Sequence, residues 1–407
     1  MKVENNQLLS ASVIVASLGY FVDIYDLLLF GIVRVASLQS LGFEGEELKN
    51  IGLHLMDVQM FGLLLGGILW GILGDKRGRL SVLFGSIFLY SVANIANGFV
   101  QSVEGYALWR FVAGVGLAGE LGAGITLVSE ILPAKKRGIG TMIVAVVGLS
   151  GAIVAGVIAK IFDWRTCYFI GGGLGLALLL LRVGVAESGM FQQSKNKNIS
   201  RGNFLALFTN SKRFLRYLRC ICIGFPTWFT VGILVTFSPE FAQALNISEQ
   251  VSAGNAIMFA YGGLVAGDLV SGLLSQILQS RKKVMFIFLA LSAVSIMVFL
   301  NAFGISANML YALCFALGFS TGFWVIFVTI AAEQFGTNLR ATVTTTVPNF
   351  VRGALVLIIA LFRFFETQTN ILTAATIVGV MCLCISFFFL YGMKETFHTD
   401  LNYEEEV

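Results

Sequence analysis

Twelve apolar segments, each long enough to cross a lipid bilayer, constrain this 407-residue chain more than any other feature. A helix rises about 1.5 Å per residue, so about 20 apolar residues cross the hydrocarbon core of a membrane. Charged or turn-rich breaks separate segments near residues 10–36, 51–73, 81–100, 105–130, 138–162, 166–184, 216–243, 251–277, 283–303, 307–334, 343–365 and 370–392. The sequence therefore predicts an all-α membrane protein with twelve transmembrane helices.

The composition agrees with this class and argues against several functions. Hydrophobic residues make up 57% of the chain and charged residues 12%, whereas soluble domains carry about 25% charged residues. The six cysteines lie in apolar stretches, and the two histidines are far apart, so neither a disulfide framework nor a metal site is indicated. No nucleotide, metal or nucleophile motif is recognisable, so we expect no enzyme activity, no cofactor beyond a coupling proton, and no nucleic-acid partner.

The loops alternate in positive charge, and this alternation predicts how the chain sits in the membrane. Cytoplasmic loops of membrane proteins are enriched in Lys and Arg. One set of connections is basic and carries Lys76, Arg77, Arg79, Lys135, Lys136, Arg137, Arg281, Lys282, Lys283 and Arg340. The opposite set carries little beyond Lys49 and Arg165. We therefore expect both termini to be cytoplasmic, in what we interpret as a bacterial inner membrane.

A polar linker and an internal repeat divide the chain into two similar halves. The predicted units are an N-terminal six-helix bundle at 1–184, a cytoplasmic linker at 185–215 and a C-terminal six-helix bundle at 216–407. Glu130 precedes Arg137 by seven residues, and Glu333 precedes Arg340 by the same spacing after the tenth helix. Two parallel, pseudo-symmetric six-helix bundles are a transporter architecture.

The first predicted helix contains two acids, Asp23 and Asp26, in "GYFVDIYDLLLF" (19–30). Each acid costs about 2.5–3.5 kcal/mol at the centre of a bilayer on insertion scales. Their i, i+3 spacing places them on one side of the helix, where they can share a proton. They are either a salt-bridged pair needed for folding or, as intramembrane acids more often are, part of an ion or substrate path.

The fourth predicted helix carries an arginine, an acid and a run of glycines. Arg110 either pairs with an acid of the first helix or extends to the outer interface, and Glu120 is either a coupling residue or half of a structural buried pair. Gly114, Gly116 and Gly119 imitate a dinucleotide fingerprint, but no strand precedes them. We therefore expect these glycines to allow close helix packing.

Three stretches carry a resemblance to a known family. "GILGDKRGR" (71–79) resembles the Gly-x-Leu-(Ala/Gly)-Asp-(Arg/Lys)-x-Gly-Arg loop of the major facilitator superfamily. "DIYD" (23–26) and the helix 4 stretch 110–138 resemble metabolite:proton symporters, with likeness to sugar porters and phosphate:proton symporters. The resemblance implies a monomeric, proton-coupled transporter that works by alternating access. It also implies a coupling set in which Asp26, with Asp23 nearby, pairs with Arg110.

The remaining candidates fall into a substrate site and a cytoplasmic gate. We expect the substrate site to contain Tyr20, Asp23, Arg110, Trp228, Asn255, Tyr261, Trp324, Asn349 and Arg352. Thr227 and Thr230 are further cavity candidates, although single aromatics more often serve packing, and Arg352 lies near enough to the cytoplasm to extend there instead. We expect the gate to contain Asp75, Arg79, Glu130, Arg137, Glu333 and Arg340, with Asp268 in a cluster with Glu333 and Arg340. Glu120 completes the coupling set.

The leading interpretation is a proton-coupled symporter that imports a small organic anion or zwitterionic metabolite. The intramembrane arginines Arg110 and Arg352 favour a negatively charged group on the substrate. The alternatives are a proton-antiport exporter of drugs or metabolites, an importer of a larger polycarboxylate such as a siderophore, and a non-transporting membrane sensor. Besides the substrate, the expected partner is the lipid bilayer.

Overall fold

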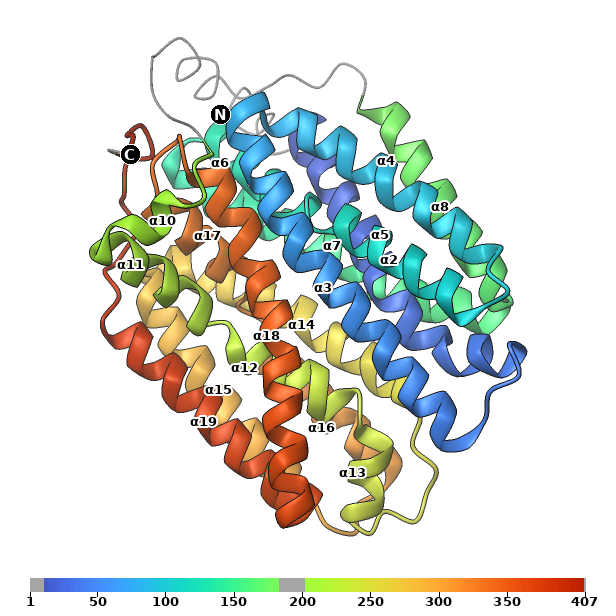
Figure 1. Cartoon of the computed structure of the whole chain (residues 1–407). Helices are drawn as coiled ribbons and strands as arrows, with labels where there is room; N and C mark the ends of the chain where they lie inside the picture. The colour runs from blue at the N-terminus through green and yellow to red at the C-terminus, as the bar shows by residue number, and fades with distance from the viewer. Residues whose placement is uncertain (1–10, 183–201, 406–407) are drawn as a thin grey trace.

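The computed structural model describes residues 11–182 and 202–405, which fold entirely into helices and connecting turns (Figure 1). Within these residues, 12 helical segments are long and apolar enough to cross a membrane. The first six are α2 (Ala11–Ser40), α3 (Gly45–Arg77), α4 (Arg79–Gly98), α5 (Val103–Leu117) with α6 (Glu120–Ile131), α7 (Ala134–Ile161) and α8 (Trp164–Leu181). The predicted all-α membrane fold is confirmed.

The second half repeats this pattern with more interruptions. Its spans are α11 (Ser211–Cys222) with α12 (Phe225–Phe229) and the π-helix η1 (Thr230–Val235), α14 (Ala253–Leu278), α15 (Arg281–Leu300), α16 (Ala307–Ser320) with α17 (Trp324–Gln334), α18 (Arg340–Gln368) and α19 (Ile371–Tyr391). Two short helices, α10 (Ala206–Thr209) and α13 (Ser238–Ala244), lie outside the spans.

The predicted linker differs from the structure at its C-terminal end. Asn210 accepts hydrogen bonds from the backbone N–H groups of Lys212 and Arg213, so α11 begins at Ser211, inside the expected linker 185–215. An asparagine in this position stabilises a helix start because it pairs N–H groups that have no partner within the helix. Residues 185–201 of the linker lie outside the described residues.

Close contacts between α3 and α18, and between α7 and α14, hold the two halves together. Figure 1 shows α3 and α18 running side by side through the middle of the molecule. Glycines allow this approach, since a side chain at Gly71 would meet the backbone of Thr342. Within the first half, a side chain at Gly114 would collide with the carbonyl of Gln59, which confirms the packing role expected for the helix 4 glycines.

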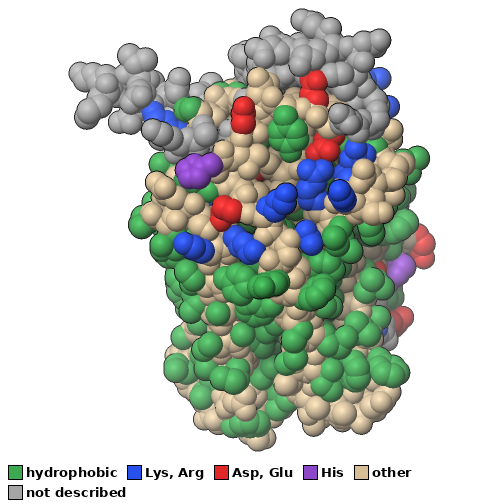
Figure 2. Space-filling model, turned by 90° about the vertical axis from the view of Figure 1, so that its left-hand side faces the viewer, with side chains coloured by type: hydrophobic (Ala, Val, Ile, Leu, Met, Phe, Trp, Pro, Cys, Tyr) green, Lys and Arg blue, Asp and Glu red, His purple; other side chains and the backbone are tan. Residues whose placement is uncertain are grey.

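Charge is concentrated at one end of the molecule. Figure 2 shows Lys, Arg, Asp and Glu side chains near the end at which the described chain starts and stops, above a broad apolar surface. An apolar belt of this kind is what a surface in contact with lipid tails requires. The protein is therefore an integral membrane protein whose helical spans cross this belt.

Candidate substrate and proton site

A cavity lies at the centre of the molecule, between the two halves. Its volume is about 20 Å³, room for about one water molecule, so the two halves close tightly around it in this structure. Its lining residues are Tyr20, Ile24, Leu27, Leu149, Thr227, Trp228, Val231, Tyr261, Leu264, Trp324 and Arg352. The first four come from α2 and α7 and the others from the second half, so a change in the angle between the halves changes the cavity.

Interrupted helices bring the lining residues of the second half together. Pro226 begins the short α12, which carries Trp228 and runs directly into the π-helix η1. A π-helix rotates the side chains that follow it and is frequent at functional sites. Trp324 stands at the first position of α17, directly after the break between α16 and α17. Pro226 thus lies at an interruption of the seventh span.

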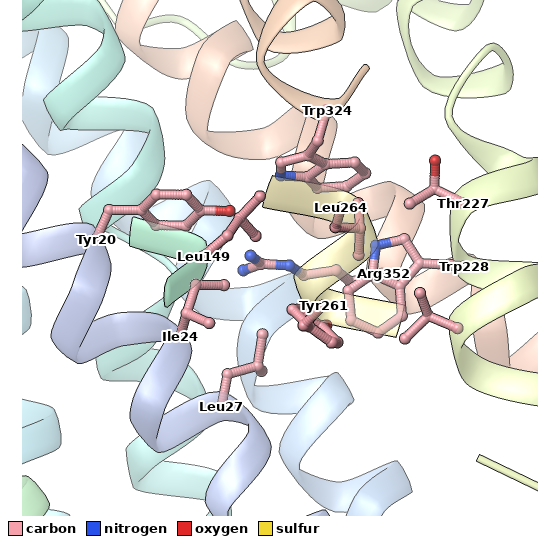
Figure 3. A pocket seen from close by; sticks show the side chains of 11 residues that line it. Tyr20, Ile24, Leu27, Leu149, Thr227, Trp228, Tyr261, Leu264, Trp324 and Arg352 are labelled. Carbon is pink, nitrogen blue, oxygen red and sulfur yellow. The ribbon is translucent and has the colours of Figure 1, made fainter. Parts of the chain in front are cut away.

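Arg352 of α18 is the charged residue of this lining (Figure 3). Its guanidinium carbon lies 5.9 Å from the ring centre of Trp228 and 5.9 Å from that of Trp324, and the side chain is buried. Figure 3 shows the guanidinium reaching from α18 toward Tyr20 and Ile24 of α2. The alternative in which Arg352 extends to the cytoplasm is therefore wrong.

The polar groups around Arg352 are mostly unpaired. Its Nη1 is 3.4 Å from the side-chain oxygen of Asn349, and its Nε has no hydrogen-bond partner among the described residues. Three further groups are buried and have no hydrogen-bond partner among the described residues: the hydroxyls of Tyr20 and Thr227 and the indole nitrogen of Trp228. Buried polar groups are normally hydrogen-bonded, so this group of donors is suited to a ligand that accepts hydrogen bonds.

The two acids of α2 are fully buried and face different cations. Arg352 is the cation within electrostatic range of Asp23, and Arg110 is the cation within range of Asp26, without a hydrogen bond in either case. Arg110 itself lies over the rings of Phe30 and Tyr168, at 5.3 Å and 5.7 Å from their centres. Arg110 is thus close to Asp26 as expected, but it is not part of the cavity lining.

Glu120 has a partner that the sequence analysis missed. Its carboxylate pairs with both terminal nitrogens of Arg182, at 2.9 Å and 2.6 Å, and also accepts a hydrogen bond from Ser86 at 2.9 Å. Arg182 ends α8, and sequence spacing alone did not associate it with the fourth span. The structure therefore brings Glu120 to Arg182, in a buried ion pair of the kind that the structural alternative describes.

Asn255 also departs from its expected place. It stands in the first turn of α14, where it lines a separate hollow with Arg34, Lys160 and Asp163 at the end opposite the described termini. This hollow lies between α2, α7 and the start of α14, and it contains two cations and one acid. The placement of Asn255 in the central cavity was wrong, because α14 lines the cavity with Tyr261 and Leu264, about two turns further along the helix.

At the other end, Asp75 connects the halves through a helix N-terminus. Its two carboxylate oxygens accept hydrogen bonds from the backbone N–H groups of Ala341 and Thr342, at 3.0 Å and 2.8 Å. These groups begin α18, where the helix dipole favours negative charge. Asp75 also lies 3.4 Å from Arg79, one turn further along. The side chain of Arg137, another member of the expected gate, lies outside the described residues.

A buried ion network adjoins this contact. Glu130 of α6 pairs with Arg79 at 2.8 Å and with Arg340 of the second half at 3.1 Å. Arg79 also donates to the carbonyl of Thr337, which precedes α18. Three members of the predicted gate, Arg79, Glu130 and Arg340, therefore meet at the junction between the halves. They join the two halves at the end of the molecule near the termini.

One expected cluster of the gate differs from the structure. Asp268 accepts a hydrogen bond from the N–H of Val325 at 3.3 Å, near the start of α17, instead of joining Glu333 and Arg340. Glu333 pairs with Arg281 at 3.2 Å, and Arg340 pairs with Glu130.

The segment after α19 was not among the candidates, yet it contacts the same region. The Leu401 carbonyl accepts a hydrogen bond from Arg340 at 2.6 Å. Glu405 exchanges two backbone hydrogen bonds with the Asn338 side chain and pairs with Arg216 at 2.9 Å. A polar tail of this length carries no periodic signal that predicts where it docks.

Among the described residues, no cluster of three or more His, Cys, Asp or Glu side chains suits a metal ion.

Comparison with known proteins agrees with this geometry. The chain is 23% identical over 374 residues to a benzoate transport protein of Acinetobacter baylyi, covering 81% of this chain and 78% of that protein. It is 27% identical over 371 residues to a proline/betaine transporter of Escherichia coli, with 82% and 73% covered. The fold is similar to the solved structure of the proton:xylose symporter XylE, with a TM-score of 0.77, 16% identity and 98% of each chain covered.

The family model described as the Major Facilitator Superfamily matches residues 12–360, which is most of the chain. This range includes the loop at 71–79, both acids of α2, the central cavity and most of α18. Members of this family are transporters rather than enzymes. Twelve spans in two halves, a cavity between the halves and the match along the sequence lead to one conclusion: the protein belongs to the major facilitator superfamily.

Proposed function

We propose that the protein is a proton-coupled symporter, working as a monomer, that imports a small organic anion or zwitterion across a bacterial inner membrane. The observation that carries the proposal is a buried guanidinium, that of Arg352, in an enclosed central cavity whose facing helix holds two buried acids. Intramembrane ionisable groups are costly and characteristically belong to ion and substrate paths.

The donors around the cavity support a negatively charged group on the substrate. Arg352 offers a planar fork of N–H groups that matches a carboxylate. The hydroxyls of Tyr20 and Thr227 and the indole N–H of Trp228 are unpaired groups of the same lining. The remaining lining residues are aliphatic or aromatic, which favours a compact apolar body next to the charged group.

The hollow at the opposite end supports the same charge preference. Its lining contains two cations, Arg34 and Lys160, and one acid, Asp163, so it carries an excess of positive charge. A cleft lined by one sign of charge raises the local concentration of ligands of the opposite sign. Benzoate carries a carboxylate, and proline and betaine are zwitterions with one, so the printed substrates of two relatives share the group that Arg352 would bind.

The mechanism that we propose is alternating access. With the network of Asp75, Arg79, Glu130 and Arg340 intact, the cytoplasmic end is closed and substrate enters from the opposite hollow. Proton and substrate then bind in the central cavity. They neutralise the charges of the buried acid and of Arg352, and the two halves can then rotate relative to one another. The network breaks, the cytoplasmic end opens, and substrate and proton leave.

The test is uptake by proteoliposomes that contain the purified protein, with an imposed pH gradient that is acidic outside. The probes are benzoate, proline and glycine betaine, with benzamide and xylose as neutral controls. We expect gradient-driven accumulation of at least one carboxylate probe and none of the neutral ones. Replacing both acids of α2, in Asp23→Asn/Asp26→Asn, should lose this accumulation while retaining exchange of unlabelled for labelled probe. Accumulation only with the gradient reversed would identify an antiporter, and preference for xylose or benzamide would contradict the anion site.

A further inference from the structure

The two acids of α2 are not equivalent in their relation to the cavity. Tyr20, Ile24 and Leu27 line the cavity, and Asp23 lies on the same stripe of α2, since positions i, i+3, i+4 and i+7 share one helix face. Asp26 is three residues further and is directed toward Gly171 and Tyr25, inside the first half. Asp23 is therefore the acid that faces the second half.

Asp23 and Arg352 approach one another from opposite halves without forming a salt bridge. Neither carboxylate oxygen of Asp23 has a hydrogen-bond partner among the described residues, and neither does the Arg352 Nε. Arg352 is nevertheless the cation whose charge acts on Asp23. In Figure 3 the guanidinium reaches toward the face of α2 that carries Tyr20 and Ile24.

The titratable groups around Asp23 come from several helices. The groups that act on Asp23, or on which it acts, are Tyr20 and Asp26 of α2, Tyr90 of α4, Glu120 of α6 and Arg352 of α18. Glu120 is neutralised by Arg182, which directly follows α8, whereas Asp26 lies near Arg110 of α5 without a hydrogen bond to it. From α7, Leu149 lines the cavity and Gly148 packs against Tyr20. Among the described residues, Arg352 is thus the cation that acts on Asp23.

We infer that Asp23, in its protonated form, donates a hydrogen bond to the same substrate carboxylate that pairs with Arg352, so that one proton enters with each carboxylate. This inference rests on the proposed function and names the coupling contact. Ionised Asp23 holds Arg352 by attraction and repels an incoming anion. Protonation removes this repulsion and supplies an O–H donor, while the substrate replaces Asp23 as the counter-charge of Arg352. The proton comes from the outer solution and leaves Asp23 after the carboxylate has gone.

The same contact defines the substrate class as a monocarboxylate with a compact, flat or branched apolar body. The rings of Trp228 and Trp324 flank the guanidinium, 6.4 Å apart between centres and inclined at 68°. Ile24, Leu27 and Leu264 provide the apolar remainder of the lining. A second carboxylate would find no further cation in this lining. Burying an unpaired charge is costly, so dicarboxylates should be rejected.

The experiment measures the affinity of the full-length protein in detergent by calorimetry, between pH 5 and pH 8. Benzoate, proline and glycine betaine are the probes, and phthalate is the dicarboxylate control. One proton bound per ligand makes the apparent affinity of the wild type fall up to about tenfold per pH unit once Asp23 ionises. Asp23→Asn, which is neutral at every pH, should bind with the same affinity throughout. Phthalate should bind at least tenfold more weakly than benzoate.

Asp26→Asn is the matched control, because it makes the same change one turn away toward Arg110. It should keep the pH slope of binding, and Asp23→Glu should keep it as well. Retention of the slope by Asp23→Asn, or its loss in Asp26→Asn, would overturn the inference while leaving a transporter that passes the liposome test. A wild type that binds none of the three carboxylate probes would contradict both the inference and the proposed function. An Asp23→Asn variant too unstable to bind is replaced by Arg352→Gln, which must lose carboxylate binding at every pH.

Discussion

Buried charges in this protein are neutralised in two different ways at the scale of single residues. Glu120 and Arg182 form a closed pair with two hydrogen bonds, completed by Ser86 and by the Leu83 carbonyl. The pair packs against Gly19 of α2, where any side chain would collide with it. Asp23 and Arg352 are by contrast close but unpaired. A closed pair stabilises one arrangement, whereas an open pair leaves room for a ligand.

The first prediction concerns the stability of the closed pair. Removing one partner of a buried ion pair leaves an uncompensated charge and costs about 3–5 kcal/mol. Glu120→Gln should therefore lower the free energy of unfolding in detergent by about this amount, and adding Arg182→Met should restore most of it. Ser86→Ala, which removes one donor to the same carboxylate, should cost only about 1 kcal/mol. Chemical unfolding followed by tryptophan fluorescence measures all four proteins.

The same variants separate structure from coupling. If Glu120 is a structural residue, the double variant should still accumulate substrate in response to a pH gradient. Loss of accumulation in a stable double variant would return Glu120 to the proton path.

At the scale of elements, acids at helix N-termini determine which segments are held together. Asp163 caps α8 within the first half, by accepting hydrogen bonds from the N–H groups of Arg165 and Thr166 at 3.0 Å and 3.2 Å. Asp75 makes the same kind of contact at α18, but from the other half. The cap at α18 can form only while the cytoplasmic ends of the halves are together.

The second prediction follows from this difference. Removing a helix cap costs about 1–2 kcal/mol. Because the lost contact joins the halves, Asp75→Ala should shift the equilibrium toward the inward-open form by a factor of about 5–30. The measurement is maleimide labelling of Thr344→Cys, which lies buried beside Thr126 of the other half, in a Cys384→Ser background. Asp163→Ala is the control and should leave the labelling rate unchanged. An equal rise in both variants would show general loosening instead of gate opening.

Another acid holds the segment after α19 against the start of α15. Glu395 accepts hydrogen bonds from the Ser280 hydroxyl and from the N–H groups of Arg281 and Lys282. Partial burial opposes ionisation of this carboxylate, but the hydrogen bonds from Ser280 and nearby N–H groups outweigh it and hold the pKa of Glu395 below its ordinary value of 4.5. These contacts therefore require the ionised form.

The third prediction is a pH dependence of this attachment. A carboxylate whose pKa is lowered in the folded protein stabilises it above the unfolded pKa, and the contribution disappears as pH falls through the folded pKa. The wild type should therefore unfold at a higher temperature than Glu395→Gln at pH 6, and the difference should shrink as pH drops below 4.5. Thermal unfolding in detergent at several pH values measures it. A difference that stays constant, or grows, on acidification would show that Glu395 does not act through its charge.

At the scale of the whole molecule, the asymmetry of charge predicts orientation. Both ends of the described chain lie at the charged end of the molecule, where the gate network also lies (Figures 1 and 2). Basic residues are retained on the cytoplasmic side during insertion. The fourth prediction is that alkaline phosphatase fused to the C-terminus is inactive in bacterial cells, whereas phosphatase inserted after Asn246, between α13 and α14, is active. The reverse pattern would mean that the gate network closes the outer side.

The sequence determined the number and positions of the spans because each segment inserts according to its own hydrophobicity. The predicted segment 307–334 has the bounds of the observed span, and most others differ by a few residues. The presence of acids in the first span and of aromatic residues and Arg352 in the second half was also evident from the sequence. These are properties of single segments, and they do not depend on how helices pack.

Which groups meet was decided only by the tertiary structure. Glu120 lies 62 residues from Arg182, and neither helix contains a signal for the pairing. Asp23 and Asp26 are separated by less than one turn, yet they face Arg352 and Arg110 respectively, because helix rotation directs neighbouring side chains toward different helices. The cavity needs the break before α17, the π-helix η1 and the close approach of α3 and α18 at the same time. Such coincidences depend on packing between distant segments, which local hydrophobicity and spacing do not specify.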